Sequence, residues 1–221
     1  MTLTIDLSQT NEVVLVELEV APAALANFHA TLDSGERECA SRFRFARDRD
    51  RYIARRGQLR ALLAERTGER TAALRIAADA YGKPFLVDRP KLHFSLSHSH
   101  GRALFAFGCE AIGCDLEWRN PELACRSVAA RLFAPAEVAA LDALPAEQWV
   151  AGFYNCWTRK EAFVKAIGLG LSYPLDAFEV SVDKAARFVT GAAGWSLVSF
   201  EPAPGFQAAL VTRLPEGATA G

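Results

Sequence analysis

The chain has 221 residues and a formal net charge of −1 at pH 7, and 51% of its residues are hydrophobic. This length allows one large or two small domains with a sizeable core. The near-neutral charge gives no general affinity for nucleic acid or a membrane surface. No apolar run reaches membrane-spanning length, residues 1–10 lack a signal-peptide pattern, and the five cysteines form no Cys-x-x-Cys pair. We therefore expect a cytoplasmic protein without disulfides or a zinc site.

The N-terminal part predicts a strand, a helix and then a strongly basic helix. Residues 12–20 are typical of a buried strand, and residues 22–32 of a helix. Between Arg42 and Arg70 stand ten arginines against four acidic residues, with apolar positions at helical spacing up to Thr67 and Gly68. This excess of one charge sign favours an anion site, although an ordinary surface helix is the alternative. A small phosphorylated ligand is favoured over nucleic acid because stacking aromatic residues are few.

Two polar segments follow the basic helix. Residues 79–85 predict a turn in which Gly82 and Pro84 hold Lys83 outward. Residues 92–96 predict a strand that leads into a polar loop, Ser-His-Ser-His-Gly, at 97–101. Short hydroxyls, histidine and glycine at a strand end can bring hydrogen-bond donors close to a phosphate. Taken alone, however, this loop is more typical of an ordinary hairpin turn.

The functional prediction centres on residues 112–117, Ile-Gly-Cys-Asp-Leu-Glu. They follow the apolar run 103–107 and a turn at 108–110, so residues 112–118 are predicted to form the second strand of a hairpin. Because strand side chains alternate, Asp115 and Glu117 share one face, and Leu116 lies on the other. Two such carboxylates repel each other in an apolar setting, and Mg²⁺ is their simplest partner. For an Asp-x-Glu pair alone, a solvated strand face is the favoured alternative.

Residues 147–167 predict the most informative helix, after two shorter ones at 123–132 and 134–144. Trp157, Glu161 and Lys165 are spaced four residues apart and therefore share one helix face. Glu161 and Lys165 could form only an intrahelical ion pair. Beside the acidic strand, they would instead supply a third carboxylate and a cation for a metal-bound phosphate. Strands are predicted at 178–182, 195–200 and 206–212, and a disordered tail at 215–221.

The two parts of the chain, residues 1–110 and 111–221, have similar plans. Each has a helix, a loop with glycine and then antiparallel strands. We therefore predict an α+β fold of two similar halves, related by a pseudo-twofold axis, with antiparallel strands packed on helices. The active site is predicted at the junction, where ligand sites are common. Two matched halves in one chain favour a monomer.

The motifs together resemble those of the 4′-phosphopantetheinyl transferases. Residues 112–117 followed by Trp-Thr-Arg-Lys-Glu-Ala-Phe-Val-Lys at 157–165 are similar to the paired acidic motifs of this family. Tyr-Gly-Lys-Pro at 81–84, Phe-Ser-Leu-Ser-His-Ser at 94–99 and Gly-Leu-Gly-Leu at 168–171 match in the same order. The length and the two-half plan resemble the surfactin-synthetase-activating type rather than the short trimeric type.

This resemblance implies transfer of 4′-phosphopantetheine from coenzyme A to a serine of an acyl- or peptidyl-carrier protein domain, with release of adenosine 3′,5′-bisphosphate. It implies that the first half binds the coenzyme and the second carries the metal and catalytic motifs. Mg²⁺ would be held by Asp115, Glu117 and Glu161, with Lys165 at the phosphate near the scissile bond. The coenzyme would be bound by Arg42, Arg51, Arg56, Lys83, Ser97 and His98, of which His98 is expected at the 3′-phosphate.

The sequence departs from the family pattern before the basic helix. Lysines that often serve the 3′-phosphate there are missing from residues 36–42, where Arg37 and Arg42 are possible substitutes. His100, at the end of the Ser-His-Ser segment, has no assigned role. Glu161 is the predicted general base, and a water bound to the metal is the competing choice. The carrier is expected to meet an apolar patch within residues 123–144 and 169–175, although these segments could be ordinary core and surface.

Three other functions remain open from the sequence. A Mg²⁺-dependent hydrolase of nucleotide pyrophosphates would use the same acidic residues and arginines with water as the nucleophile. A non-enzymatic module could bind coenzyme A through the basic segment. Nucleic-acid binding is the weakest alternative and would show itself as salt-sensitive binding to duplex DNA.

Overall fold

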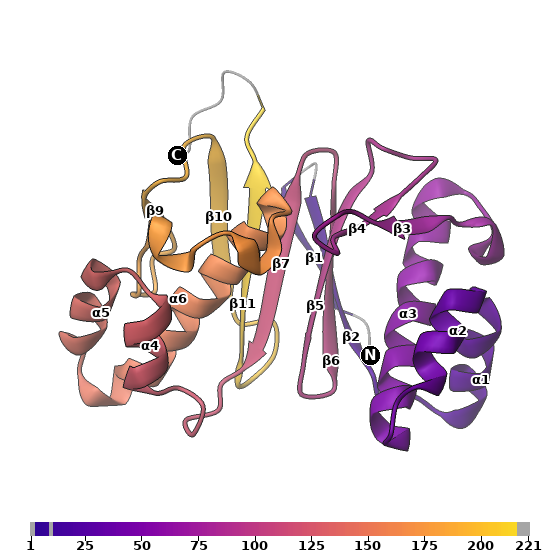
Figure 1. The fold of residues 1–221 in the computed structure, drawn as a ribbon, viewed down its shortest axis with the longest axis horizontal. Coiled ribbons are helices and arrows are strands. Elements are labelled where there is room, and N and C mark those ends of the chain that lie inside the picture. The colour runs from indigo at the N-terminus through magenta and orange to yellow at the C-terminus, as the bar shows by residue number, and fades with distance from the viewer. Residues whose placement is uncertain (1–2, 9–10, 216–221) are drawn as a thin grey trace.

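In the computed structural model, residues 3–8 and 11–215 are described, and their elements form four layers. Two β-sheets lie in the middle, with α3 covering the outer face of one and α6 that of the other (Figure 1). The predicted disordered tail lies, from residue 216 onward, outside the described residues. None of the described helices combines the length and apolar composition of a membrane span.

The first sheet belongs to the N-terminal half. It contains β1 (Leu3–Ser8), β2 (Asn11–Glu17), β5 (His93–Ser99) and β6 (Arg102–Gly108), all antiparallel, in the order β1-β2-β6-β5. The outer face packs on α3 (Ala46–Thr67), against which α1 (Pro22–Thr31) and α2 (Ser34–Ser41) also pack. As predicted, α3 ends at Gly68, whose left-handed conformation (φ 72°) returns its N–H to Ala64 O.

The second sheet belongs to the C-terminal half. It contains β7 (Ile112–Trp118), β10 (Trp195–Phe200) and β11 (Phe206–Arg213), antiparallel in the order β10-β11-β7. Its outer face is covered by α6 (Ala146–Ile167), and α5 (Pro135–Asp142) packs beside α6, with α4 (Arg126–Leu132) next to α5. Smaller elements complete the fold: η1 (Thr71–Ala73), the hairpin of β3 (Ile76–Ala78) and β4 (Pro84–Leu86), η2 (Gly170–Ser172), η3 (Leu175–Ala177), and the pair β8 (Glu179–Val180) and β9 (Phe188–Thr190).

The inner faces of the two sheets pack on each other. Buried apolar side chains from β2 and β6, including Leu15 and Leu104, meet Cys114 and Leu116 of β7 and Leu210 of β11. This core joins the halves, so strands that are distant in sequence share one hydrophobic layer.

The predicted hairpin between residues 103–107 and 112–118 is wrong. β6 pairs with β2 and β5, whereas β7 pairs with β11, placing Asp115 opposite Ala209. Both segments are apolar enough to be buried on two faces, and the short connection at 109–111 passes from one sheet to the other. Local pattern therefore identified the strands correctly but assigned the wrong partner to β7.

The Ser-His-Ser segment is also not a loop. β5 continues to Ser99, and the turn is made by His100 and Gly101, which have φ values of 45° and 82°. The backbone pairing of His98 with Ala103 and of Ser99 with Arg102 extends the strand to its end. The polar side chains of this segment are consequently held on a strand, where they alternate between two faces.

The α+β class is confirmed by these antiparallel sheets and their covering helices. The order of elements along the chain also recurs: a strand is followed by helices, a two-stranded unit and two final strands, from β2 to β6 and again from β7 to β11. In space, the corresponding strands are ordered β2-β6-β5 in the first sheet and β7-β11-β10 in the second. The predicted boundary at residues 110 and 111 falls in the connection between β6 and β7. The pseudo-twofold axis itself stays a prediction.

Candidate active site

The acidic strand β7 lies directly beneath α6. A Cβ at Gly113 would overlap the carbonyl oxygen of Ala162 and the amide nitrogen of Ala166, so the helix rests on the strand backbone. Because Glu161 and Lys165 immediately precede those two alanines, the close approach brings both side chains to the strand. Segments far apart in the sequence therefore supply one group of charges.

Asp115 is the centre of this group. Its Oδ1 accepts hydrogen bonds from Lys165 Nζ at 2.6 Å and from Ser97 Oγ at 2.8 Å. Its Oδ2 is buried and has no hydrogen-bond partner among the described residues. A buried carboxylate oxygen without a partner is unfavourable by about 1–3 kcal/mol or more. The site therefore offers one carboxylate oxygen that still requires a donor or a cation.

The other two acidic side chains, Glu117 and Glu161, have raised pKa values. Burial, followed by the charge of Asp115, raises the pKa of Glu117 to about 7. Burial and then Asp115 also raise the pKa of Glu161, against the opposing effect of Lys165. Burial would lower the pKa of Lys165, but Asp115 outweighs it and holds that pKa above its usual value. Asp115 therefore repels both glutamates, and the ammonium of Lys165 offsets the charge of these carboxylates only in part.

A divalent cation fits this donor set. Asp115 Oδ2 has no hydrogen-bond partner among the described residues, and burial followed by the charge of Asp115 raises the pKa values of Glu117 and Glu161. A cation among these oxygens would give Asp115 Oδ2 a partner and offset the repulsion. Within residues 3–8 and 11–215, no three His, Cys, Asp or Glu side chains lie close enough together to hold a metal ion in this conformation. Lys165 holds Asp115 Oδ1 in this conformation.

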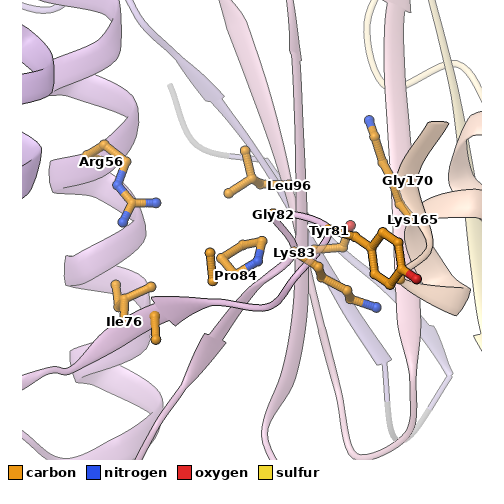
Figure 2. Close-up of a pocket in the computed structure, with 13 residues that line it drawn as sticks. Arg56, Ile76, Tyr81, Gly82, Lys83, Pro84, Leu96, Lys165 and Gly170 are labelled. Atoms are coloured by element: carbon orange, nitrogen blue, oxygen red, sulfur yellow. The ribbon is translucent and has the colours of Figure 1, made fainter. Parts of the chain in front are cut away.

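A cleft of about 450 Å³ leads to this group from the N-terminal half. Figure 2 shows its lining from α3, the β3–β4 hairpin, β5 and the end of α6. The cationic side chains in the lining are Arg56, Lys83 and Lys165, and apolar side chains such as Ile76 and Leu96 complete the walls. Apolar walls with a few cations are suited to a nucleotide with phosphate groups.

Several predicted coenzyme ligands already have partners. Lys83 Nζ donates to Ala166 O at 2.8 Å and to Ile112 O at 3.2 Å. Arg56 Nε donates to Glu36 Oε1 at 2.6 Å, and Arg51 Nε donates to Glu19 Oε1 at 2.7 Å. Arg42 pairs with Glu38 on the surface. Arg37, the other possible substitute for the missing lysines, donates to Leu32 O. These contacts compete with any phosphate contact by the same groups.

Arg55 is a cation that the sequence did not single out. It makes no ion pair with a described residue, and its buried Nε has no hydrogen-bond partner there. Burial and the neighbouring Arg56 lower the pKa of Arg55 to about 10. Partial removal from water, then the charge of Arg55, lowers the pKa of the otherwise exposed His98 to about 4. The cations near His98 are Arg55, Lys165 and Arg51, and they are opposed by the carboxylate of Asp115.

Part of the arginine excess is structural. Arg60 is fully buried and donates to Glu36 Oε2 at 2.6 Å, to Thr71 O at 3.0 Å and to Leu74 O at 3.1 Å. The guanidinium of Arg60 therefore ties α3 to α2 and to the segment around η1. The basic composition of α3 overstates the number of groups that are free to bind an anion.

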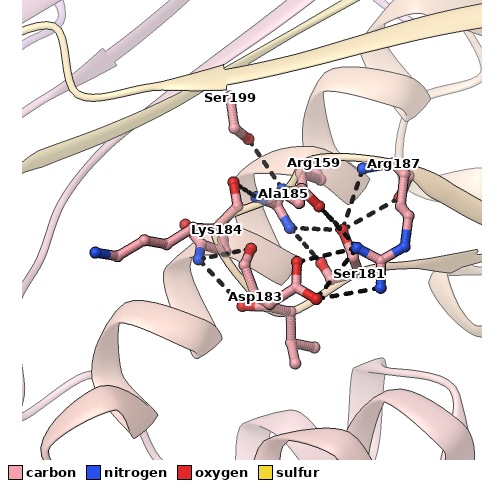
Figure 3. Close-up of polar contacts among 9 residues, drawn as sticks. Arg159, Ser181, Asp183, Lys184, Ala185, Arg187 and Ser199 are labelled. Atoms are coloured by element: carbon pink, nitrogen blue, oxygen red, sulfur yellow. Dashed lines mark hydrogen bonds and ion pairs between the residues drawn. The ribbon is translucent and has the colours of Figure 1, made fainter. Parts of the chain in front are cut away.

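Arg159, in the motif of α6, also has a structural role. It is buried, and it donates to Ser199 Oγ at 2.9 Å and to Ser181 Oγ at 2.9 Å (Figure 3). Burial lowers its pKa to about 10. These bonds connect α6 to β10 and to the segment after β8. Arg159 therefore holds the helix that carries Glu161 and Lys165, and it does not face the cleft.

The predicted carrier-binding surface stays a prediction. Leu123 is 66% exposed, and Trp118, at the end of the acidic strand, is also exposed. Leu141 of α5 is buried in the core of the second half, so only part of the 123–144 segment is available to a partner.

Two family models match separate parts of the chain. Residues 20–107 match the family model described as 4′-phosphopantetheinyl transferase, N-terminal, and residues 111–208 match that of the 4′-phosphopantetheinyl transferase superfamily. The chain is 37% identical to the 4′-phosphopantetheinyl transferase HetI of Nostoc sp. over 85% of this chain and 81% of that protein. It is 32% identical to the 4′-phosphopantetheinyl transferase psf-1 of Bacillus pumilus over 83% and 79% of the two chains.

The chain therefore belongs to the 4′-phosphopantetheinyl transferase superfamily. Its 32% identity to Sfp of Bacillus subtilis, over 69% of this chain and 67% of that one, places it with the Sfp type, as the resemblance of its motifs predicted.

Proposed function

We propose that this chain transfers the 4′-phosphopantetheine group of coenzyme A to a serine hydroxyl of an apo carrier-protein domain and releases adenosine 3′,5′-bisphosphate. Membership of the superfamily supports the reaction. The structural observation that carries it is the buried Asp115 Oδ2, which has no hydrogen-bond partner among the described residues. Its carboxylate contacts Lys165 and repels Glu117 and Glu161 at the end of a cleft whose lining includes three cationic side chains.

The carboxylates of Asp115, Glu117 and Glu161 would hold Mg²⁺, which supplies positive charge to the diphosphate of the coenzyme when it is bound. Lys165 withdraws charge from the phosphate that reacts and stabilises the negative charge that builds up on the leaving group. Glu161 accepts the proton of the attacking serine hydroxyl. A glutamate that also holds Mg²⁺ is a weaker base than a free one, so a water bound to the metal is the competing choice.

The coenzyme would occupy the cleft of the N-terminal half. Arg56 and Lys83 line that cleft, and Ser97 and His98 lie on the adjoining strand. The C-terminal half contributes the metal ligands and Lys165. The carrier domain approaches from the exposed end of β7, and the chain acts as a cytoplasmic monomer.

Mass spectrometry of carrier domains tests this function. The protein is incubated with coenzyme A, Mg²⁺ and a panel of apo acyl- and peptidyl-carrier domains. We expect at least one carrier to gain a phosphopantetheine group on its serine, and Asp115→Ala, shown to be folded by circular dichroism, to abolish the gain. No modification of any carrier, together with bisphosphate release in the absence of a carrier, would favour the hydrolase instead.

A further inference from the structure

The two sheets meet along β5 and β7 through side chains. Within the described residues, β5 pairs by its backbone with β6 and β7 pairs with β11, and no backbone ladder joins β5 to β7. Instead, Ser95, Ser97 and Ser99, which alternate along β5 and share one face, all hydrogen-bond to β7. Serine hydroxyls of one half thus bridge to the acidic strand of the other.

The geometry of Ser99 assigns its proton. Its Oγ accepts a hydrogen bond from Trp118 N at 3.0 Å and lies 2.9 Å from Glu117 Oε2. Because a backbone N–H can only donate, the hydroxyl proton is left for the carboxylate. Ser99 therefore donates to Glu117 while it is itself held by the backbone of the next residue on β7.

The other two serines define the pattern. Ser97 Oγ accepts from Lys165 Nζ at 3.0 Å and donates to Asp115 Oδ1 at 2.8 Å. Ser95 Oγ accepts from Cys114 N at 3.1 Å, and none of its hydrogen bonds in the described residues goes to a carboxylate. The hydroxyls of Ser97 and Ser99 thus donate to the two carboxylates of β7, whereas the hydroxyl of Ser95 bonds to the backbone of β7 only.

We propose that Ser99 is a positioning residue that orients Glu117 for the divalent cation. This inference rests on the proposed function, and neither the motif resemblance nor the family match assigns Ser99 a role. Glutamate has a long, flexible side chain whose ordering opposes binding. A hydroxyl that fixes one carboxylate oxygen beforehand removes part of this cost, as outer-shell partners do at other metal sites.

Equilibrium binding of Mn²⁺, measured by calorimetry, tests the role without relying on turnover. We expect Ser99→Ala to weaken Mn²⁺ binding by about tenfold, which is the low end of the effect of losing an outer-shell partner. Ser99→Thr keeps the hydroxyl and should bind within about twofold of the wild type. Ser99→Cys, of similar volume but with a weaker donor, should lie between them and provides a second variant should Ser99→Ala fold poorly.

Ser95→Ala is the matched control. It removes a hydroxyl from the same row and weakens the contact between the strands, but it touches no carboxylate. We expect Ser95→Ala to lower the melting temperature and to leave Mn²⁺ affinity unchanged. A double-mutant cycle adds specificity: in the Glu117→Ala background, Ser99→Ala should have no further effect on Mn²⁺ binding.

Two results would overturn the role of Ser99 while leaving the transferase intact. One is a folded Ser99→Ala variant with wild-type Mn²⁺ affinity, and the other is an equal loss of affinity in Ser95→Ala. In transfer assays, Ser99→Ala should raise the half-saturating Mg²⁺ concentration and leave the KM for coenzyme A unchanged at saturating Mg²⁺. A wild-type protein that binds no Mn²⁺ and modifies no carrier would instead overturn the metal site and the proposed function together.

Discussion

At the scale of single residues, Glu117 shows most clearly what burial beside another carboxylate does. Its pKa rises from the ordinary value of 4.5 to about 7, first through burial and then through Asp115. The ionised carboxylate is therefore disfavoured in the folded protein, and any cation that enters the group relieves the same repulsion. Glu117 consequently links the stability of the metal-free protein to pH.

In the metal-free protein, Glu117 should contribute a loss of stability as pH rises from about 4.5 to about 7, opposite in sign to the contribution of His98, whose pKa is lowered to about 4. In this range the unfolded chain releases the Glu117 proton while the folded protein retains it, so unfolding is favoured by rising pH. Below the range both states are protonated, and above it the loss is complete. Urea unfolding of the wild type and of Glu117→Gln with a chelator at pH 5 and pH 8 isolates the Glu117 contribution.

Glu117→Gln should remove part of this pH dependence and be more stable than the wild type at pH 8. Glu122→Gln, at an exposed position, is the matched control and should follow the wild-type profile. Identical pH profiles for Glu117→Gln and the wild type would contradict the link.

Arg55 should contribute to the affinity for the coenzyme. Its charge reaches His98, and it has no carboxylate partner among the described residues, whereas Arg51 and Arg56 have Glu19 and Glu36. Arg55→Ala should therefore raise the KM for coenzyme A by about tenfold, the effect of one charge-assisted hydrogen bond of about 1.5 kcal/mol. Steady-state kinetics at a saturating carrier concentration measures it.

Dephospho-coenzyme A identifies which phosphate is involved. If Arg55 and His98 hold the 3′-phosphate, Arg55→Ala should weaken coenzyme A and leave the dephospho form unaffected. An equal loss for both would place Arg55 at the diphosphate. Arg75→Ala, which removes an exposed arginine paired with Asp88, is the control, and an unchanged KM for coenzyme A in Arg55→Ala would contradict the assignment.

The sequence predicted which charged side chains of β7 and α6 lie together better than it predicted which arginines of α3 lack a carboxylate partner. Asp115 and Glu117 were found by strand alternation, and Glu161 and Lys165 by helical spacing, because both periods are local properties. Which arginines of α3 are neutralised depends on acids from other elements, such as Glu36 of α2. No local pattern contains that information.

At the scale of elements, the contact between β7 and α6 determines whether the charges meet. Gly113 should be essential to it, because a Cβ would overlap backbone atoms of Ala162 and Ala166, which cannot move like a side-chain end. We expect Gly113→Ala to lower the free energy of unfolding by about 1–3 kcal/mol or more, as overpacking does. It should also lower kcat, because α6 carries Glu161 and Lys165.

Urea unfolding and transfer kinetics measure the two effects of Gly113→Ala. Gly35→Ala is the matched control: this glycine lies in α2, and its added Cβ would meet only the Asp33 carboxylate at an ordinary 3.5 Å. We expect the control to be neutral or slightly stabilising, since alanine favours helix. Wild-type stability in Gly113→Ala would show that β7 and α6 can separate without consequence.

Strand pairing was the part of the element-scale prediction that failed. Residues 103–107 and 112–118 were correctly identified as strands, but a short connection between apolar strands is compatible with a hairpin or with a step between packed sheets. The partner of β7 is β11, whose position follows from burying both faces of the sheet. Such a choice depends on the whole core and not on the turn.

At the scale of the whole molecule, the site exists only where the halves meet. β5 contributes the hydroxyls of Ser97 and Ser99, and β7 and α6 contribute the carboxylates and Lys165. Relative motion of the halves would separate hydroxyls from carboxylates and change the cleft. Contacts that fix the junction are therefore expected to affect catalysis and stability together.

Lys83 is such a contact. It comes from the β3–β4 hairpin of the first half, and its ammonium donates to Ala166 O near the end of α6 and to Ile112 O of β7. Burial lowers the pKa of Lys83, and the two carbonyls that accept from the ammonium offset part of the cost of removing its charge from water. The motif resemblance assigns this lysine to the coenzyme, whereas the contacts also give it a role in the free protein.

Replacing Lys83 with methionine separates these roles, because the side chain keeps its length and loses its charge. If the ammonium joins the halves, Lys83→Met should lower the free energy of unfolding by about 1–3 kcal/mol without coenzyme, since two carbonyls lose their donor. Lys184→Met, at an exposed position, should leave the stability unchanged. A Lys83→Met protein as stable as the wild type but with a raised KM for coenzyme A would limit Lys83 to ligand binding. A loss in both would show that the group that joins the halves also meets the substrate, so that coenzyme binding must replace the carbonyls as partners of the ammonium.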